Sequence, residues 1–302
     1  MIDPVGLRSL VAIERLGSVG AAATALEYTP SAVSQQIKRL EAHTGVRLLE
    51  RQGRGVLLTE AGRSLTESAR ELLAEMERLE SRVRGFAEAP AGLVRLAVFA
   101  TAYRGIVVGA LEGLRRSAPG VEVRLDEIEP WDAIESVAGG RHDLALVHNW
   151  EPMPLPVPDH VEIRHLGSDL ADLLVHRDHP LATRRDVSVH DVVEEDWVSV
   201  APGSICHQWL LKMFSDIGRT PRITYVAQEF ATHVALVAGG HAVALVPRLG
   251  RGPLPAEAVA VPITRPVSQR TISVVWRATM GTSPALGAVI EAVGREADRA
   301  LE

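Results

Sequence analysis

Residues 59–88 restrict the fold of this 302-residue chain most, because they contain no proline and repeat apolar side chains at alternating steps of four and three. This spacing is a heptad seam, typical of a helix that packs along a second helix. One helix of about 30 residues would be roughly 45 Å long. The seam consists of Leu65, Ala69, Leu72, Met76, Leu79, Val83 and Phe86. Because it is narrow and flanked by Arg and Glu, we expect it to join two copies of the chain rather than to lie on its own domain's core.

Residues 1–58 read as three short helices followed by a β-hairpin. The first helix, in PVGLRSLVAIERLG, ends at a glycine, and the second, in SVGAAATAL, begins at the N-cap Ser18. The third, in TPSAVSQQIKRLEAHTG, has Thr29 as its N-cap, Pro30 at its first position and Gly45 beyond its end. VRLLERQGRGVLLT then has two apolar arms around QGRG, which predicts a hairpin with a basic tip. This order of elements indicates a winged helix-turn-helix domain.

The third of these helices has one apolar face, because Val33, Ile37 and Leu40 recur at steps of four and three. Its other face carries hydroxyl, amide and basic side chains, which can bind base edges or neutralise phosphates. A solvated polar face is the alternative. The Ala-rich helix before it, the basic hairpin and the dimer helix after it favour a helix that enters the major groove of DNA. The candidate DNA-contacting residues are Ser31, Ser34, Gln35, Lys38, Arg39, Arg51 and Arg54.

The rest of the chain, from APAG at 89–92 onwards, alternates apolar strand-like runs with helical stretches. Helices are expected at 103–117, 131–139 and 284–299. The expected strands are LVRLAVFA, VEVRLDEI, DLALVHN, LADLLVH, DWVSVA, RITYVA, AVALVP and TISVVWRA. The alternation is typical of a parallel sheet in an α/β fold. Pattern alone allows either one large α/β domain or two smaller lobes.

Composition restricts the class of protein. Apolar residues make up 46% and charged residues 23% of the chain, as in a soluble globular protein. The start, MIDPVGLRSL, has no signal-peptide pattern, so we expect a cytoplasmic protein. The single cysteine, Cys206, agrees with a reducing compartment and is expected to be a packing residue. The net charge is −6, but residues 1–58 hold seven Lys or Arg against five Asp or Glu, a sum of +2 that leaves −8 for the remainder.

Few features indicate an enzyme. Histidines stand beside acids at 142–143 and 176–179, but without the spacing of two zinc ligands on a helix, and GxSxG and Walker patterns are missing. We therefore expect no catalytic residue, no metal and no cofactor. A solute-binding protein without DNA-binding activity is a further alternative. The missing export signal and the roughly 90 residues before the α/β region count against it.

The stretch SVGAAATALEYTPSAVSQQIKRLEAHTGVRLLERQGRGVLLTEAG resembles the N-terminal region of LysR-type transcriptional regulators. The resemblance lies in the paired alanines, the SAVSQQIKRLE helix, the LLER turn and the LTEAG entry to the linker helix. It implies a homodimer or homotetramer that binds a partly palindromic double-stranded DNA operator and responds to a small-molecule effector. The family positions that approach DNA are occupied here by Pro30, Ser31, Ser34, Gln35 and Arg54. Gln35 stands where many members carry Arg.

The resemblance also implies an effector domain of two α/β lobes, similar to periplasmic solute-binding proteins, with the ligand between them. The chain would cross between the lobes near 148–158 and again near 262–270, and the proline-rich EPMPLPVP supports the first crossing. The predicted parts are a DNA-binding domain at 1–58, a linker helix at 59–88 and an effector domain at 89–302, with lobe one at about 92–160 and 266–302 and lobe two at about 161–265.

Ligands of open α/β sheets lie beyond the carboxyl ends of the strands. Thr101 and Ser204 each precede a helix there, so their hydroxyls and the following amides are candidates for holding an anion; ordinary helix capping is the alternative. Glu229 would add a negative charge, so a zwitterion or a cation fits as well as a simple carboxylate. The candidate effector-binding residues are Ala100, Thr101, Ala102, His148, Asn149, Pro202, Gly203, Ser204, Gln228, Glu229 and Pro247.

Overall fold

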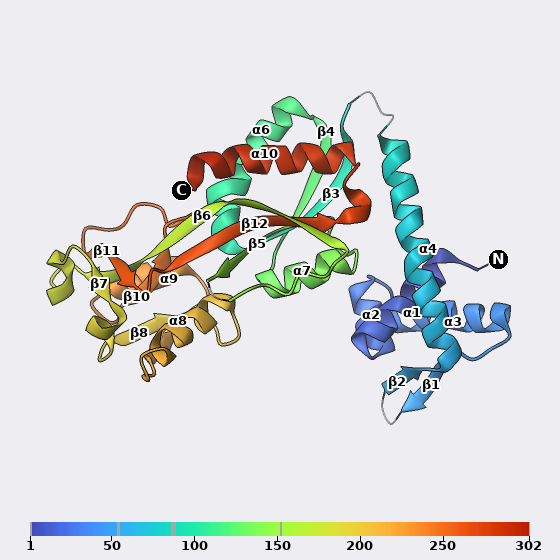
Figure 1. Ribbon diagram of the computed structural model, residues 1–302, viewed down its shortest axis with the longest axis horizontal. Coiled ribbons are helices and arrows are strands. Elements are labelled where there is room, and N and C mark those ends of the chain that lie inside the picture. Colours follow the sequence, from blue (N-terminus) through green and yellow to red (C-terminus); the bar gives the residue numbers. More distant parts are fainter. Residues whose placement is uncertain (1, 53–54, 86–88, 152, 302) are drawn as a thin grey trace. The chain divides into compact units, whose positions relative to one another are not determined.

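The computed structural model describes residues 2–52, 55–85, 89–151 and 153–301 (Figure 1). The chain divides into two compact units, which are described separately. The first contains the N-terminal 88 residues and two short later segments, and the second contains nearly all of the rest. Within the described ranges, no helix is both long enough and apolar enough to cross a membrane.

The first unit contains the predicted helices and hairpin. Its elements are α1 (Pro4–Leu16), α2 (Val19–Ala25), α3 (Pro30–Thr44), β1 (Leu49–Gln52), β2 (Gly55–Leu58) and α4 (Glu60–Arg84). The predicted N-caps Ser18 and Thr29 accept hydrogen bonds from the backbone N–H groups of Ala21 and Ala32. Gly45 ends α3 with a left-handed φ of 73°, a conformation that costs glycine little. The winged helix-turn-helix expectation is confirmed in its order of elements.

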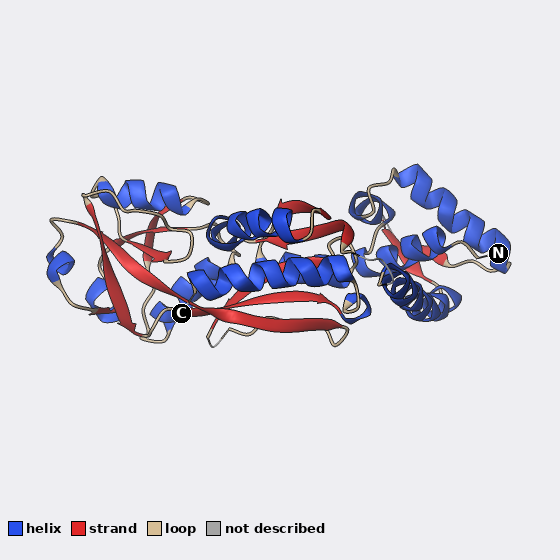
Figure 2. Cartoon of the chain, turned by 90° about the horizontal axis from the view of Figure 1, so that it is seen from above, coloured by secondary structure: helices blue, strands red, loops and turns tan. Residues whose placement is uncertain are grey.

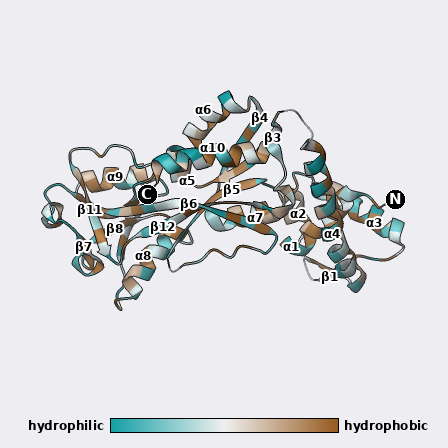
Figure 3. Ribbon diagram, turned by 45° about the horizontal axis from the view of Figure 1, so that its top comes forward, coloured by the Kyte–Doolittle hydropathy of each residue, from teal (hydrophilic) through white to brown (hydrophobic). Residues whose placement is uncertain are grey.

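Helix α4 is buried against its own domain at its start and exposed further along. Its first turns pack on the core of the helix-turn-helix, where Ala69 is 1% exposed and Leu65 is partly buried. Further along, Leu72, Leu79 and Val83 are 49%, 54% and 61% exposed. Hydrophilic and hydrophobic bands alternate along this helix in Figure 3. The prediction that Ala69 faces a partner is therefore wrong, because the core of its own domain already covers it. Leu65 is partly buried and its role in the seam stays a prediction; Phe86 lies outside the described residues.

The second unit is built on one mixed sheet, with strands in the order β4-β3-β5-β12-β6-β11-β7 and β10 paired to β6. A two-stranded sheet of β8 and β9 lies beside it. The strands are β3 (Ala91–Val98), β4 (Gly120–Glu127), β5 (Leu144–Trp150), β6 (Val161–His176), β7 (Val187–Ser188), β8 (Asp196–Ser199), β9 (Arg222–Val226), β10 (Ala244–Pro247), β11 (Ala258–Arg265) and β12 (Gln269–Arg277). The expected parallel pairing occurs between β3 and its neighbours β4 and β5, whereas β12 is antiparallel to both β5 and β6, so the sheet is mixed.

Helices cover this sheet on its faces. They are α5 (Ala100–Ala102), the π-helical turn Tyr103–Val107, α6 (Val108–Ser117), α7 (Pro130–Ala138), α8 (Ile205–Ser215), α9 (Phe230–Ala238) and α10 (Pro284–Ala300), with short 3-10 turns at Pro180–Thr183, Val189–Val192 and Ala278–Met280. In Figure 2 the helix that ends at the C-terminus, α10, lies along the long strands. Its apolar residues, among them Leu286, Val289 and Val293, are buried there.

The long strand β6 links the two halves of this unit. Its residues 161–170 pair with β12, whereas residues 171–176 pair with β10 and β11. The first crossing between the expected lobes therefore lies inside β6, rather than in the proline-rich stretch at 148–158. A strand can make this crossing because 16 residues extend over roughly 50 Å. Prolines lack the N–H that a central strand must donate, which leaves the proline-rich stretch as a connection between β5 and β6.

Candidate functional site

Helix α3 separates its apolar and polar residues as predicted. Val33, Ile37 and Leu40 are 0%, 3% and 2% exposed. The polar candidates lie on the other side: Pro30, Ser31, Gln35, Lys38 and Arg39 are exposed and Ser34 is half-buried. The side chains of Gln35, Lys38 and Arg39 form no hydrogen bond or ion pair with residues that the structure describes. Their donors are therefore available to a molecule outside the chain.

The two adjacent glutamines of α3 have different surroundings. The Oε1 atom of Gln36 accepts a hydrogen bond from the hydroxyl of Ser9 at 2.5 Å, and Ser9 is fully buried in α1. Gln36 thus fixes α3 against α1 while Gln35 points away from the domain. Ser34 donates its hydroxyl to the carbonyl of Pro30 at 2.8 Å, so its oxygen remains an acceptor.

The hairpin beside α3 is formed by β1 and β2, which pair antiparallel with Arg51 opposite Val56. The side chain of Arg51 and the whole of Arg54 lie outside what the structure describes, so their predicted DNA contacts remain predictions. Gly62, at the start of α4, lies under this hairpin. A Cβ on Gly62 would be 2.2 Å from the carbonyl oxygen of Leu48, so a larger residue would push the hairpin away from α4.

A buried charged cluster lies where β12 and β6 run together in the second unit. The guanidinium of Arg270, 1% exposed, donates from Nε to Asp169 at 2.9 Å and from Nη2 to the hydroxyl of Thr101 at 2.7 Å. Its Cζ atom also lies 5.3 Å from the ring centre of Phe99 and 5.8 Å from that of Trp150. Arg270 is thus already neutralised by a carboxylate and surrounded by aromatic faces.

His148 belongs to the same cluster. Its ring lies edge-on to Phe99, with centres 4.5 Å apart, and to Trp150, with centres 6.2 Å apart. Burial, and then the positive charge of Arg270, lower the pKa of His148 well below its usual value. The imidazole is therefore neutral at physiological pH.

Helix α8 begins beside a carboxylate of the chain itself. Ser204 caps this helix by accepting the N–H of His207, and its hydroxyl donates to the carbonyl of Ala201 at 2.9 Å. The carboxylate of Glu129 accepts a hydrogen bond from the Ile205 N–H, although burial raises the pKa of Glu129 overall. The position at which Ser204 was expected to help hold an anion is thus occupied by Glu129.

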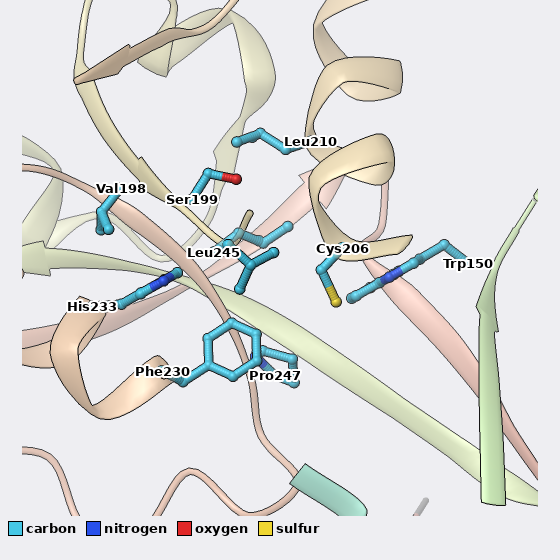
Figure 4. A pocket seen from close by; sticks show the side chains of 10 residues that line it. Trp150, Val198, Ser199, Cys206, Leu210, Phe230, His233, Leu245 and Pro247 are labelled. Carbon is cyan, nitrogen blue, oxygen red and sulfur yellow. The ribbon is translucent and has the colours of Figure 1, made fainter. Parts of the chain in front are cut away.

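A cavity of about 20 Å³ lies between α8, α9, β8 and β10 and is closed on one side by Trp150. In Figure 4, Val198, His233 and Phe230 lie on one side of it, and Cys206 and Trp150 on the other. Its lining is Trp150, Val198, Ser199, Val200, Cys206, Leu210, Phe230, His233, Leu245 and Pro247. Burial raises the pKa of Cys206 to about 11, so its thiol stays protonated at neutral pH.

Three of the predicted effector-binding residues lie at the Arg270 cluster or at the cavity beside it. Thr101 and His148 adjoin the Arg270 cluster, and Pro247 lines the cavity. The remaining predictions are placed as follows: Ala100 and Asn149 are half-buried, Ala102 is fully buried, Ser204 caps α8, and Pro202, Gly203, Gln228 and Glu229 are exposed. Sequence reasoning missed Arg270 and Asp169. Arg270 lies two residues before Ile272 and four before Val274, so all three share one buried face of the strand, and a charged residue on such a face indicates a buried ion pair.

One serine, histidine and aspartate set resembles a catalytic arrangement in composition only. The Nδ1 atom of His142 lies 2.5 Å from the Ser136 hydroxyl, and its Nε2 atom lies 2.8 Å from Asp126. Ser136 is 0% exposed, so its oxygen cannot reach a substrate. Among the described residues, no group of three or more metal-ligating side chains is gathered in one place.

Comparisons with known proteins match the helix-turn-helix region and the α/β region to two separate family models. Residues 5–63 match the family model "Bacterial regulatory helix-turn-helix protein, lysR family", and residues 87–298 match "LysR substrate binding domain". The small neutral protease regulatory protein of Streptomyces coelicolor is 32% identical over 241 residues, which cover 78% of this chain and 71% of that protein. The hydrogen peroxide-inducible genes activator of Dickeya chrysanthemi is 28% identical over 279 residues, covering 90% and 88%.

Solved structures show the same fold. Full-length OxyR from Pseudomonas aeruginosa has a TM-score of 0.69 at 20% identity, covering 98% of this chain and 95% of that one. Full-length CbnR in complex with its target DNA has a TM-score of 0.55 at 25% identity, covering 98% and 99%. The two matched family models cover the helix-turn-helix and the α/β unit, and most of α4 lies between the two matches. The chain belongs to the LysR family of DNA-binding transcriptional regulators and carries that family's substrate-binding domain.

Proposed function

We propose that this regulator binds double-stranded DNA with the exposed face of α3 in the major groove and the β1–β2 hairpin beside it. The main support is the difference between the two faces of α3. Three apolar residues at 0–3% exposure pack this helix onto the domain core, while Gln35, Lys38 and Arg39 are exposed and form no hydrogen bond or ion pair with a described residue. A glutamine amide can pair with an adenine edge, and the two basic side chains can neutralise phosphates. Base readout is therefore assigned to Gln35.

We further propose that α4 pairs with α4 of a second copy. The stripe of Leu72, Leu79 and Val83 is exposed in the single chain, and apolar residues at heptad spacing are stabilised when a second helix covers them. Pairing places two copies of α3 on two half-sites of an operator and doubles the phosphate contacts. The doubling compensates for the small positive charge of the first 58 residues.

We also propose that the second unit binds a small-molecule effector whose binding changes how the paired helices engage DNA. The support is the matched substrate-binding domain and the cavity beside the buried Arg270 cluster. We assign the chain no catalytic activity, since its relatives are named as transcriptional regulators and Ser136, the only nucleophile of its Ser136–His142–Asp126 set, is buried. We propose a cytoplasmic location, since that is where its DNA partner would be met.

Footprinting of the purified full-length protein on the DNA upstream of its own gene tests the proposal. We expect protection of two segments separated by a multiple of the DNA helical repeat, about 10–10.5 base pairs, with affinity that falls steeply between about 50 and 200 mM salt. Failure to retain any genomic fragment in a sequence-dependent manner would overturn the assignment.

A further inference from the structure

The cavity lined by Trp150 and His233 holds two buried polar atoms that have no strong hydrogen-bond partner within the described chain. The Nδ1 atom of His233 is buried and has no hydrogen-bond partner there, and the buried Nε1 atom of Trp150 meets only the thiol of Cys206, a weak acceptor. Each of the two side chains is only 1% exposed, so bulk water does not reach them freely. Buried polar groups without a partner are uncommon in folded proteins, because their desolvation is uncompensated. Their position in one cavity points to a ligand that supplies both partners.

The hydrogen-bonding role of each atom is fixed. An indole N–H can only donate. The Nε2 atom of His233 lies 2.9 Å from the carbonyl oxygen of Ala227, and a carbonyl can only accept, so Nε2 carries the proton. Burial lowers the pKa of His233 and keeps the ring neutral, which leaves Nδ1 as an acceptor. The cavity thus presents one donor, on Trp150, and one acceptor, on His233.

The rest of the lining is uncharged. Most of it is aliphatic or aromatic, the thiol of Cys206 is protonated, and the hydroxyl of Ser199 is already hydrogen-bonded to Nδ1 of His207 at 3.1 Å. Arg270 is paired with Asp169, and Glu129 accepts a hydrogen bond from the Ile205 N–H while burial raises its pKa. An ion placed here would lose its hydration without gaining a counter-charge, which is costly in a dry site.

We propose that this cavity is a binding site for a small uncharged molecule with an apolar, ring-like body, which accepts a hydrogen bond from Trp150 and donates one to His233. The proposal rests on the proposed function, since it names the chemical class of the effector. It differs from the anion, zwitterion or cation expected from Thr101, Ser204 and Glu229, because those residues are paired to the chain or exposed.

The size of the cavity links binding to regulation. At about 20 Å³ it has room for about one water-sized molecule in this conformation. Its walls come from separate elements, with Leu210 on α8, Phe230 on α9 and Leu245 on β10, so the site widens only when these elements move apart. A ligand that fits only the widened state shifts the population towards that state. Because α8 is also bound by Glu129 from the loop before α7, its movement changes a contact between the two halves of the unit.

Thermal unfolding of the full-length protein with charge-matched probes tests the proposal. The uncharged probes are phenol, benzyl alcohol and benzamide, and the controls are toluene, benzoate and benzylamine. We expect at least one uncharged hydrogen-bonding probe to raise Tm by about 2 °C or more, a larger rise than with toluene and no rise with the two ions. A rise with benzoate or benzylamine alone, or no rise with any uncharged probe, overturns the proposal.

The indole N–H signals of the five tryptophans provide a direct readout by NMR. Binding should shift one signal downfield, and this signal should be missing in Trp150→Phe, which keeps the ring but removes the donor. Trp276→Phe is the matched control, because the buried Nε1 of Trp276 has no described partner but lies outside the cavity lining. His233→Leu should abolish the Tm response. A full response in Trp150→Phe and His233→Leu overturns the proposal.

Footprinting distinguishes a failure of the proposed DNA-binding function from a failure of the cavity assignment. Retained operator binding in each variant shows that the fold and the proposed function survive. Loss of the probe response in variants that still bind DNA supports the cavity assignment. If the wild-type protein binds its operator but ignores every uncharged probe, the proposed function stands and the cavity assignment fails.

Discussion

Arg270 and Asp169 form an ion pair in which Nη2 lies 2.7 Å from the carboxylate and the two side chains are only 1% and 4% exposed. Such a pair is weak evidence for stability, because two charges have lost their hydration, but breaking it leaves one charge buried alone. Arg270 also holds Thr101, so the pair connects β12, β6 and the turn after β3.

Removing one partner of this pair should therefore destabilise the second unit strongly. We expect Asp169→Leu to cost about 3–5 kcal/mol, visible as a lower Tm and a lower urea midpoint. The double change Asp169→Leu with Arg270→Met should recover most of the loss, because no charge is then left unpaired. Equal destabilisation in the single and double variants would contradict this account.

Gln35 and Gln36 should separate recognition from stability. Gln35→Ala is expected to relax the preference for one base pair by about 1–3 kcal/mol and to leave Tm unchanged, because Gln35 is exposed and bonds no described residue. Gln36→Ala should lower Tm by removing the partner of the buried Ser9. Binding to operators with single base-pair changes, together with calorimetry, checks both. A lower Tm in Gln35→Ala would return that residue to a structural role.

Lys38 should act on DNA without selecting a base. Lys38→Ala is expected to weaken binding evenly across operator variants and to reduce the slope of log affinity against log salt by about one. Filter-binding titrations at several salt concentrations measure this slope. An unchanged slope would show that Lys38 does not contact a phosphate.

The stripe on α4 should control association. Replacing Leu72 and Leu79 together by Asp places two charges on residues that are 49% and 54% exposed in the single chain, so the fold should tolerate them while the paired helices separate. Sedimentation should show a smaller species, and operator affinity should fall with it. Glu67→Lys, an exposed change off the stripe, is the control and should leave the mass unchanged. A double variant of unchanged mass would show that copies associate elsewhere.

His148 should make the second unit sensitive to acid. Its pKa in the folded chain lies well below 6.5, so the unfolded chain binds a proton near pH 6.5 while the folded chain does not. The free energy of unfolding should therefore decrease as pH falls below about 6.5 towards the folded pKa. Tm measured between pH 7.5 and pH 5 should fall less steeply in His148→Phe, while the exposed His190→Gln should follow the wild type. Parallel profiles in all three proteins would remove His148 as the cause.

The N-terminal unit was predictable because its determinants are local. Caps at Ser18 and Thr29, the stop at Gly45 and the spacing of Val33, Ile37 and Leu40 each act within a few residues, and the structure confirms them. The heptad pattern was also local, but its partner was not. Ala69 carries the same apolar signal whether α1 or a second chain covers it, so its burial in its own domain was not readable from spacing.

In the second unit, the strand pairing and the buried contacts could not be predicted from the sequence. Strand-like runs predicted most of its strands, but β12 is the last strand in the chain and returns antiparallel between β5 and β6, a choice decided by distant pairings. The crossing within β6 likewise depends on which partners pair with each half of the strand. Arg270 and Asp169 are 101 residues apart, and Trp150 on β5 and His233 on α9 line one cavity.

The sequence by itself determined the order of domains, the two faces of α3 and the family resemblance, because periodicity, capping and the motifs of residues 18–62 are properties of neighbouring residues. The tertiary structure alone decided which charges are already paired and which polar atoms are buried without a partner. Hydrogen bonding and desolvation depend on what surrounds a side chain in space. That difference moved the candidate ligand from an ion at helix ends to an uncharged molecule beside Trp150 and His233.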